Sequence, residues 1–244
     1  MSADRLPFLK AVIAAPADDL PRLVFADWLD EHDDPRGEFV RLQVDRHRRG
    51  VAGIGPREYQ LLLAHEPAWR AELPAGCHQM RFRRGFVDRL RCHARHLFDR
   101  EHPLLAPVEH LTVEVSHLRA EWLAHSPPPL AVPVRELVVD CREPVGRELL
   151  TVLRRFGPFE RLEALRLRDP MFGLFGADAL RPDDTFPSLR VLDLSGCGVT
   201  DGGAEALAEN GWAGRLTELV LHDNPISAGR RVWLRHRFGG RLVI

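Results

Sequence analysis

Apolar residues recur along most of the chain in a short, regular pattern. The pattern is clearest in Leu189–Ala208, where Leu192 and Leu194 alternate with Asp193 and Ser195. This period of two predicts a short strand that buries its leucines and displays the residues between them. Glycines then indicate a turn, and alanine and leucine at helical spacing end the stretch. One strand and one helix cannot cover their own apolar face, so we expect such units to stack.

The strand pattern recurs in six copies. Its apolar triplets are Val87/Leu90/Cys92, Val108/Leu111/Val113, Val134/Leu137/Val139, Leu162/Leu165/Leu167, Leu189/Leu192/Leu194 and Leu216/Leu219/Leu221. Successive triplets begin 21 to 28 residues apart, and Cys197 or Asn224 follows the last two. These two copies resemble the L-x-x-L-x-L-x-x-N/C signature of leucine-rich repeats. Ser116, Arg142 and Pro170 occupy that polar position in earlier copies, so those turns must be satisfied otherwise.

The resemblance implies an α/β fold, namely a leucine-rich-repeat solenoid forming a short horseshoe arc of about six repeats. We assign the solenoid to residues 81–244, with a short closing strand within residues 237–244 as its C-terminal cap. In solenoids the concave sheet is the usual binding face. We therefore expect a protein partner to contact the displayed residues Arg89, Arg91, His110, Glu136, Arg166, Arg168, Asp193, Glu218 and His222. The alternative is that these are only solvated strand residues.

Residues 1–50 follow a helical period and predict a small all-helical domain. Apolar residues from Leu6 to Ile13 indicate a helix that ends before Pro16. A second helix should begin after Asp18 or Asp19, and a third should span residues 38–48. The residues expected to line the second helix are Leu20, Leu23, Val24, Asp27, Trp28 and Leu29. Residues 51–80 predict a linker and a capping helix over 57–65, with Tyr59, Leu62 and Leu63 directed inward.

The run Pro16–Gln43, PADDLPRLVFADWLDEHDDPRGEFVRLQ, resembles the repeat-companion domain at the N-terminus of many bacterial leucine-rich-repeat proteins. The match begins at Phe8 and departs from the family pattern at Phe25, where the family has Tyr, and at His32, where it has Gly. The resemblance implies a bacterial protein with a helical cap domain. It implies no activity, because the family has none assigned.

Four polar or aromatic residues of this motif are candidates for a site: Asp27, Trp28, Arg36 and Glu38. One interpretation is an arginine and carboxylate constellation that grips a partner or a peptide terminus. The other is structural: Asp18 and Asp34 cap helices, Asp27 pairs with Arg36 or Arg22, and Trp28 lies in the core. We favour the structural interpretation, because caps and pairs account for each residue separately.

Composition adds only a few constraints. The chain has 244 residues, 45% of them hydrophobic, and a formal net charge of -1. It contains no apolar run of about 18 residues, the length needed to span a bilayer, so we expect a cytoplasmic protein without a membrane partner. The net charge is no reason to expect nucleic acid. The four cysteines lie far apart without a C-x-x-C pair, and we expect free thiols.

Two competing functions can be weighed from the sequence. Basic clusters at Arg81-Arg83-Arg84-Arg89-Arg91-Arg95 and Arg230-Arg231-Arg235-Arg237-Arg241 could hold phosphates or nucleic acid, but aromatic residues suited to base stacking are not interleaved on exposed strand positions. An enzyme is the second alternative, possible above all as an unrecognised activity of the N-terminal domain. However, no catalytic motif or phosphate loop is present.

The pairs Cys77-His78 and Cys92-His93 could in principle gather around zinc across adjacent strands. Because Cys92 falls at an inward strand position, we favour a core thiol. The sequence as a whole predicts a non-catalytic protein-interaction scaffold with no cofactor and no metal.

Overall fold

The computed structural model describes residues 3–73, 76–93, 110–115, 134–141, 143, 145–146, 148–157, 159–175, 177, 180 and 185–244. The sequence predictions that involve Arg95, Val108, Ser116 and Arg142 lie outside these residues.

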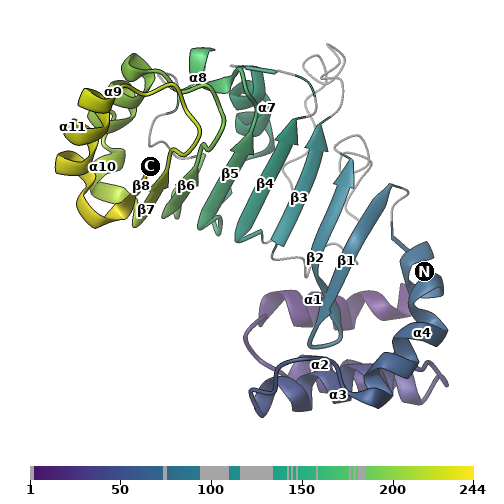
Figure 1. Ribbon diagram of the computed structural model, residues 1–244. Helices are drawn as coiled ribbons and strands as arrows, with labels where there is room; N and C mark the ends of the chain where they lie inside the picture. The colour runs from purple at the N-terminus through teal and green to yellow at the C-terminus, as the bar shows by residue number, and fades with distance from the viewer. Residues whose placement is uncertain are drawn as a thin grey trace.

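The described residues form a mixed α/β fold with an eight-stranded sheet whose strand order equals the chain order (Figure 1). The strands are β1 Cys77–Arg83, β2 Phe86–His93, β3 His110–Val115, β4 Glu136–Cys141, β5 Ala164–Arg168, β6 Val191–Asp193, β7 Glu218–Val220 and β8 Leu242–Val243. β1 and β2 form an antiparallel hairpin, and every later neighbouring pair is parallel. The sequence did not predict β1, and the predicted closing strand is limited to the two residues of β8.

The leucine positions of successive strands stand in one register. Leu90, Leu111, Leu137, Leu165, Leu192 and Leu219 are consecutive ladder partners. Each is at most 2% exposed, and burying one leucine contributes about 1.5 to 3 kcal/mol. The predicted alternation of these strands is therefore confirmed.

Helices cover the leucine side of the sheet. They are α7 Glu148–Phe156, α8 Phe172–Phe175, α9 Asp201–Glu209, α10 Trp212–Arg215 and α11 Ala228–Phe238, followed by the 3-10 turn Gly239–Arg241. Leu153 of α7, Leu207 of α9 and Trp212 of α10 belong to the same buried cluster as the strand leucines. The opposite side of the sheet carries the displayed residues.

Side chains at the turns link each unit to the one before it. The buried Asn224 accepts a hydrogen bond from the backbone nitrogen of Val199 at 2.8 Å and donates to the Leu194 oxygen at 2.8 Å. Where Pro170 occupies the equivalent position, the buried Asp169 carboxylate accepts from the nitrogens of Val145 and Gly146 instead. Asp169, the residue before Pro170, thus accepts the backbone hydrogen bonds that the proline side chain cannot accept.

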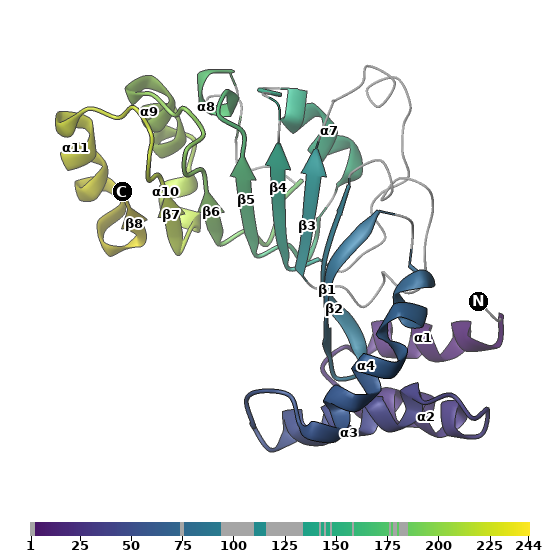
Figure 2. The ribbon, with the colours of Figure 1, turned by 45° about the vertical axis from the view of Figure 1, so that its right-hand side comes forward.

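The N-terminal helices form a separate group, which we call the helical module (Figure 2). It consists of the 3-10 turn Ala3–Arg5, α1 Leu6–Ala14, α2 Leu20–Asp30, α3 Arg36–Arg48 and α4 Pro56–Ala71. The first three helices agree with the prediction, whereas α4 is longer than expected.

Several apolar positions of the helical module face solvent, contrary to the prediction. Tyr59 and Leu63 of α4 are 55% and 64% exposed, and Leu20 and Val24 of α2 are 62% and 45% exposed. The buried positions of α4 are Glu58, Leu61 and Trp69. Helix α4 buries this face because Phe39 of α3 and Phe82 of β1 pack around Trp69.

The tip of the β1–β2 hairpin docks into the helical module. Arg84 and Gly85 form its two-residue turn with φ values of 50° and 85°, the signature of a type I′ turn. The Arg84 guanidinium donates to the carbonyl oxygens of Pro16 at 2.7 Å and Ala17 at 3.1 Å. The Gly85 nitrogen donates to Gln43 Oε1 at 2.7 Å. These bonds fasten the sheet to the helices.

Candidate functional site

The side of the sheet opposite the leucines presents three columns of residues, which we call the charged face. The first column is Arg89, His110, Glu136, Ala164, Val191 and Glu218; the second is Arg91, Thr112, Val138, Arg166, Asp193 and Val220; the third is His93, Glu114, Asp140 and Arg168. The structure therefore brings together the predicted strand residues. His222 is exposed and follows β7 by one buried residue.

Ion pairs run sideways across the charged face, from strand to strand. Arg91 Nε lies 2.5 Å from Glu114 Oε1, and Arg91 Nη2 lies 2.5 Å from Asp140 Oδ2. Further along the sheet, His110 Nδ1 and Arg166 Nε each lie 2.9 Å from oxygens of Glu136. Most charges are thus held by a partner on a neighbouring strand, which restricts their rotamers.

Asp193 is the exception to the predicted display, because its side chain is only 6% exposed. Arg166 and Arg168 of β5 reach across it, with Nη1 and Nη2 at 3.3 and 2.8 Å from Asp193 Oδ2. The nitrogen and hydroxyl of Ser195 donate to its other oxygen. Burial alone would raise the pKa of Asp193, but the hydrogen bonds from Arg168 and Ser195 lower this pKa to about 2. The alternation of strand residues does not predict the burial of Asp193, because two long side chains of another strand cover its carboxylate.

The lowered pKa predicts how stability depends on pH. The ordinary pKa of 3.8 falls to about 2 on folding, so the Asp193 carboxylate stabilises the protein above about pH 4 and this stabilisation is lost as the pH falls towards 2. We expect Asp193→Asn to lose about 2 kcal/mol of unfolding free energy at pH 7 and to flatten the stability curve between pH 4 and 2. Urea unfolding across this range measures both effects. Glu209→Gln, at an exposed site, is the control and should reproduce the parent curve.

Glu114 lies at the N-terminal end of the charged face and is buried, at 3% exposure. Besides Arg91, it has His93 Nδ1 at 3.3 Å and His78 Nε2 at 3.7 Å from its Oε2. These two histidines and Glu114 occupy the polar side of the sheet. Like Asp193, Glu114 is covered by longer neighbours, so it contributes charge to the face but little accessible surface.

The cysteines adjoining these histidines occupy the opposite side of the hairpin. Cys77 and Cys92 are register partners, and Cys92 is fully buried, as the core-thiol interpretation predicted. The hydrogen bond from Cys92 to Cys77, together with burial, raises the pKa of the Cys92 thiol. Neighbouring strand residues point to opposite faces, so the cysteine and histidine pairs do not converge on one point. Among the described residues there is no group of three or more His, Cys, Asp or Glu side chains placed to hold a metal.

The four residues of the N-terminal motif do not form one site. Asp27 pairs with Arg41 at 2.7 Å, and not with Arg36 or Arg22 as expected. Arg36 instead forms a bidentate pair with Glu72 and lies over the ring of Trp69.

Glu38 pairs with Arg57 at 2.6 Å. Trp28 is half-buried and stacks on Phe25 and His32. The Glu72 and Arg57 partners lie beyond the motif, so sequence spacing within it could not identify them.

Two smaller expectations for the helical module are confirmed. Asp18 and Asp34 accept hydrogen bonds from the backbone nitrogens of Leu20 and Arg36, the first residues of α2 and α3. Arg22, which had been expected to pair with Asp27, donates to the Asp18 carbonyl oxygen.

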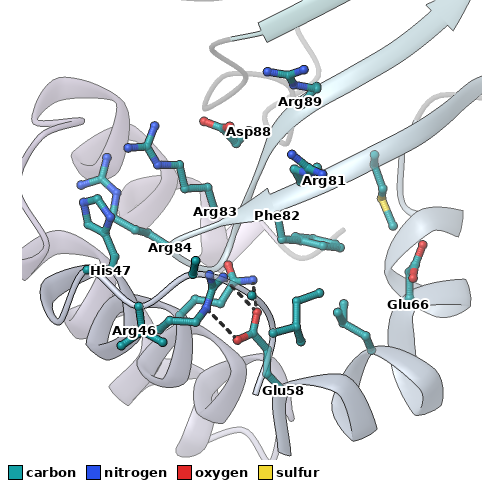
Figure 3. Close-up of a pocket in the computed structure, with 18 residues that line it drawn as sticks. Arg46, His47, Glu58, Glu66, Arg81, Phe82, Arg83, Arg84, Asp88 and Arg89 are labelled. Atoms are coloured by element: carbon teal, nitrogen blue, oxygen red, sulfur yellow. Dashed lines mark hydrogen bonds and ion pairs between the residues drawn. The ribbon is translucent and has the colours of Figure 1, made fainter. Parts of the chain in front are cut away.

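A cavity that the sequence did not reveal lies between α3, the loop after it, α4 and the β1–β2 hairpin (Figure 3). Its volume is about 730 Å³. We call it the arginine pocket, after the basic side chains Arg46, His47, Arg81, Arg83, Arg84 and Arg89 that line it. Three segments separated in sequence build the pocket, namely residues 43–54, 58–66 and 80–89. The basic cluster in the sequence indicates only the arginines of the third segment.

One family model matches the chain: that of a leucine-rich repeat, over residues 187–208. This range coincides with the stretch in which the strand and helix pattern is clearest. The comparisons with curated proteins and with solved structures found no match. In the described part of the chain, no helix combines the length and the apolar character needed to cross a membrane.

Proposed function

We propose that the chain is a non-catalytic protein-interaction module that binds a partner protein on the charged face. In this proposal residues 81–244 form a leucine-rich-repeat solenoid, capped by a bacterial repeat-companion domain at residues 1–50, in the cytoplasm. The leucine-rich-repeat match supports it, because this motif is commonly a protein-interaction module. The free thiols of the four cysteines fit a reducing compartment.

The observation that carries the proposal is the in-register charged face itself. Adjacent strands place charged side chains in columns on a sheet side that the packed helices leave open. Ion pairs between strands hold these side chains before any partner arrives. A surface ordered in advance loses less conformational entropy on binding.

The signs of the charges favour a protein over nucleic acid on this face. Four arginines share this face with five carboxylates: Arg89, Arg91, Arg166 and Arg168, and Glu114, Glu136, Asp140, Asp193 and Glu218. A phosphate backbone needs a continuous basic surface. Mixed charges instead match a protein surface of complementary pattern.

The test uses the double variant Asp140→Ala/Arg168→Ala, which removes the two outer charges of the face. Their side chains are 36% and 39% exposed. Arg91 then keeps Glu114, and Asp193 keeps Arg166, so no charge loses its last partner and the fold should persist. We expect the parent chain to retain a partner protein from lysate of its source cells, and the double variant to bind that partner about tenfold more weakly.

A matched variant on the helical side controls for the loss of one acid and one base. Glu209→Ala/Arg237→Ala changes exposed residues of α9 and α11 and should bind the partner like the parent. Melting temperatures well above the assay temperature for all three proteins establish that each is folded. If the partner binds the charged-face variant and the parent equally well, the proposal is wrong.

A further inference from the structure

The arginine pocket carries more positive charge than its own carboxylates can neutralise. Two of the three acidic groups in its lining are held by a close partner, and the third, Asp88, lies only at the edge of pairing distance from a histidine. Glu58 accepts from Gln43 at 2.7 Å and from Arg46 Nε at 3.0 Å. Glu66 pairs with Arg70 at 2.6 Å, and Asp88 lies 4.0 Å from His110 Nε2.

Three guanidinium groups of the pocket are left over. Arg81, Arg83 and Arg89 are exposed, and within the described part of the chain no side-chain partner is found for them. Figure 3 shows them on the two strands of the hairpin, above Arg46 and His47. They are therefore available to an anion that enters the pocket.

The register of the hairpin concentrates this charge. Arg81 and Arg89 are direct partners across β1 and β2, beside a bulge that interrupts the ladder. Like charges directly opposite each other destabilise an antiparallel pair, and bulges commonly redirect side chains at functional sites. An anion bound between the two guanidinium groups would relieve the repulsion.

Two further basic residues, Arg84 and His47, line the pocket. Arg84 is buried where it anchors the hairpin, and its guanidinium is paired with Asp19 Oδ1 at 3.3 Å. Burial and the nearby charges of Arg84 and Arg83 lower the pKa of His47. Protonating this histidine is thus disfavoured by the same cations that would attract an anion.

The pocket also has an apolar wall. Val51 and Ile54 of the loop between α3 and α4 are 54% and 56% exposed, and Leu62, Met80 and Phe82 complete the lining. A cavity of about 730 Å³ is large enough for a nucleotide-sized molecule. The combination of cations on one side and apolar groups on another suits a ligand with both characters.

In the second arginine cluster noted from the sequence, most of the arginines already have partners. Arg230 pairs with Glu205, and Arg231 and Arg241 donate to backbone carbonyls. These arginines hold the C-terminal helix and turn in place. Only Arg235 and Arg237 are exposed there without a side-chain partner in the described residues.

We propose that the arginine pocket binds a small organic polyphosphate of nucleotide size, with its phosphates between Arg81, Arg83 and Arg89 and its apolar or planar body against Ile54 and Leu62. Arginine suits this role because its planar guanidinium donates two parallel hydrogen bonds to a phosphate. The pocket adjoins the charged face, because Arg89 belongs to both, but its proposed ligand is distinct from the partner protein proposed for that face.

The test is calorimetric titration of the full chain with two probes, inorganic tripolyphosphate and ATP, in the absence of divalent metal ions. We expect saturable binding of both, and tighter binding of ATP because only ATP can contact the apolar wall. Arg81→Gln/Arg83→Gln should weaken both by about tenfold or more and leave the fold intact, since both residues are exposed and, in the described residues, no ion pair is found for either. Ile54→Ser should weaken ATP alone.

The matched control is Arg235→Gln/Arg237→Gln, which removes two exposed arginines of the other cluster and should leave both affinities unchanged. The proposal is overturned if neither probe binds saturably, or if the Arg81 and Arg83 variant binds both like the parent. It is also overturned if a single-stranded oligonucleotide binds the parent in an Arg81- and Arg83-dependent way while both small probes do not, which would assign the arginines to a nucleic-acid surface.

Discussion

Replacing Gly85 with alanine should destabilise the protein by about 3 kcal/mol or more, because two penalties coincide at this position. Gly85 has a φ of +85°, in the left-handed region that alanine adopts at a cost. A Cβ atom there would also lie 2.4 Å from Val40 Cγ2 and 2.8 Å from Val40 Cα. Val40 belongs to the packed face of α3, so the hairpin tip would have to leave the helical module.

Gly53→Ala separates the two penalties. Gly53 has nearly the same φ, +86°, but a Cβ atom there would have no neighbour within 4 Å. We expect this variant to lose only about 1 kcal/mol, the cost of the backbone conformation. Urea unfolding of both variants gives the comparison. Equal losses would show that the contact between Gly85 and Val40 contributes nothing to stability.

Asn224→Ala should be the second most damaging change, with a loss of about 3 kcal/mol, since a buried amide with several backbone partners would disappear. Its Nδ2 group donates to the oxygens of Leu194 and Leu221 at 2.8 and 3.0 Å, and Oδ1 accepts from the Val199 nitrogen. Alanine would leave these buried backbone groups without partners. The unfolding free energy, measured with urea, tests the value.

Cys197→Ala provides the comparison at the equivalent position of the preceding unit. The Cys197 thiol is buried, and it donates to the Leu167 oxygen at 3.2 Å. A thiol is a weak donor, so we expect a loss of about 1 kcal/mol, mostly from packing. A larger loss for Cys197→Ala than for Asn224→Ala would contradict the role given to the amide.

The repeating strands could be predicted because their signal is local. The period of two in each triplet defines one buried side, and a ladder of leucines follows once the units stack. The hairpin strand β1 escaped this reasoning for a physical reason. Gln79 has a φ of 50° and the register shifts between His78 and Arg81, so the alternation is broken in the middle of the strand.

The candidate sites were less predictable, because they depend on the reach of long side chains between distant segments. Which residues share the charged face follows from alternation, but the burial of Asp193 depends on how Arg166 and Arg168 fold over it. Likewise, Arg36 pairs with Glu72, which lies outside the motif that suggested a site. The arginine pocket needs α3, α4 and the hairpin together.

The identity of strand order and chain order also has a consequence for how the protein folds. Every described strand pairs with its neighbour in sequence, so each pairing within the sheet needs only the next unit of the chain, although parallel strands joined by a long connection pair more slowly than the strands of a hairpin. The β1–β2 hairpin, closed by two residues, can form within about 1 to 10 microseconds and offers its free β2 edge to the next strand. During synthesis the sheet can therefore grow towards the C-terminus, one strand at a time, as each unit leaves the ribosome.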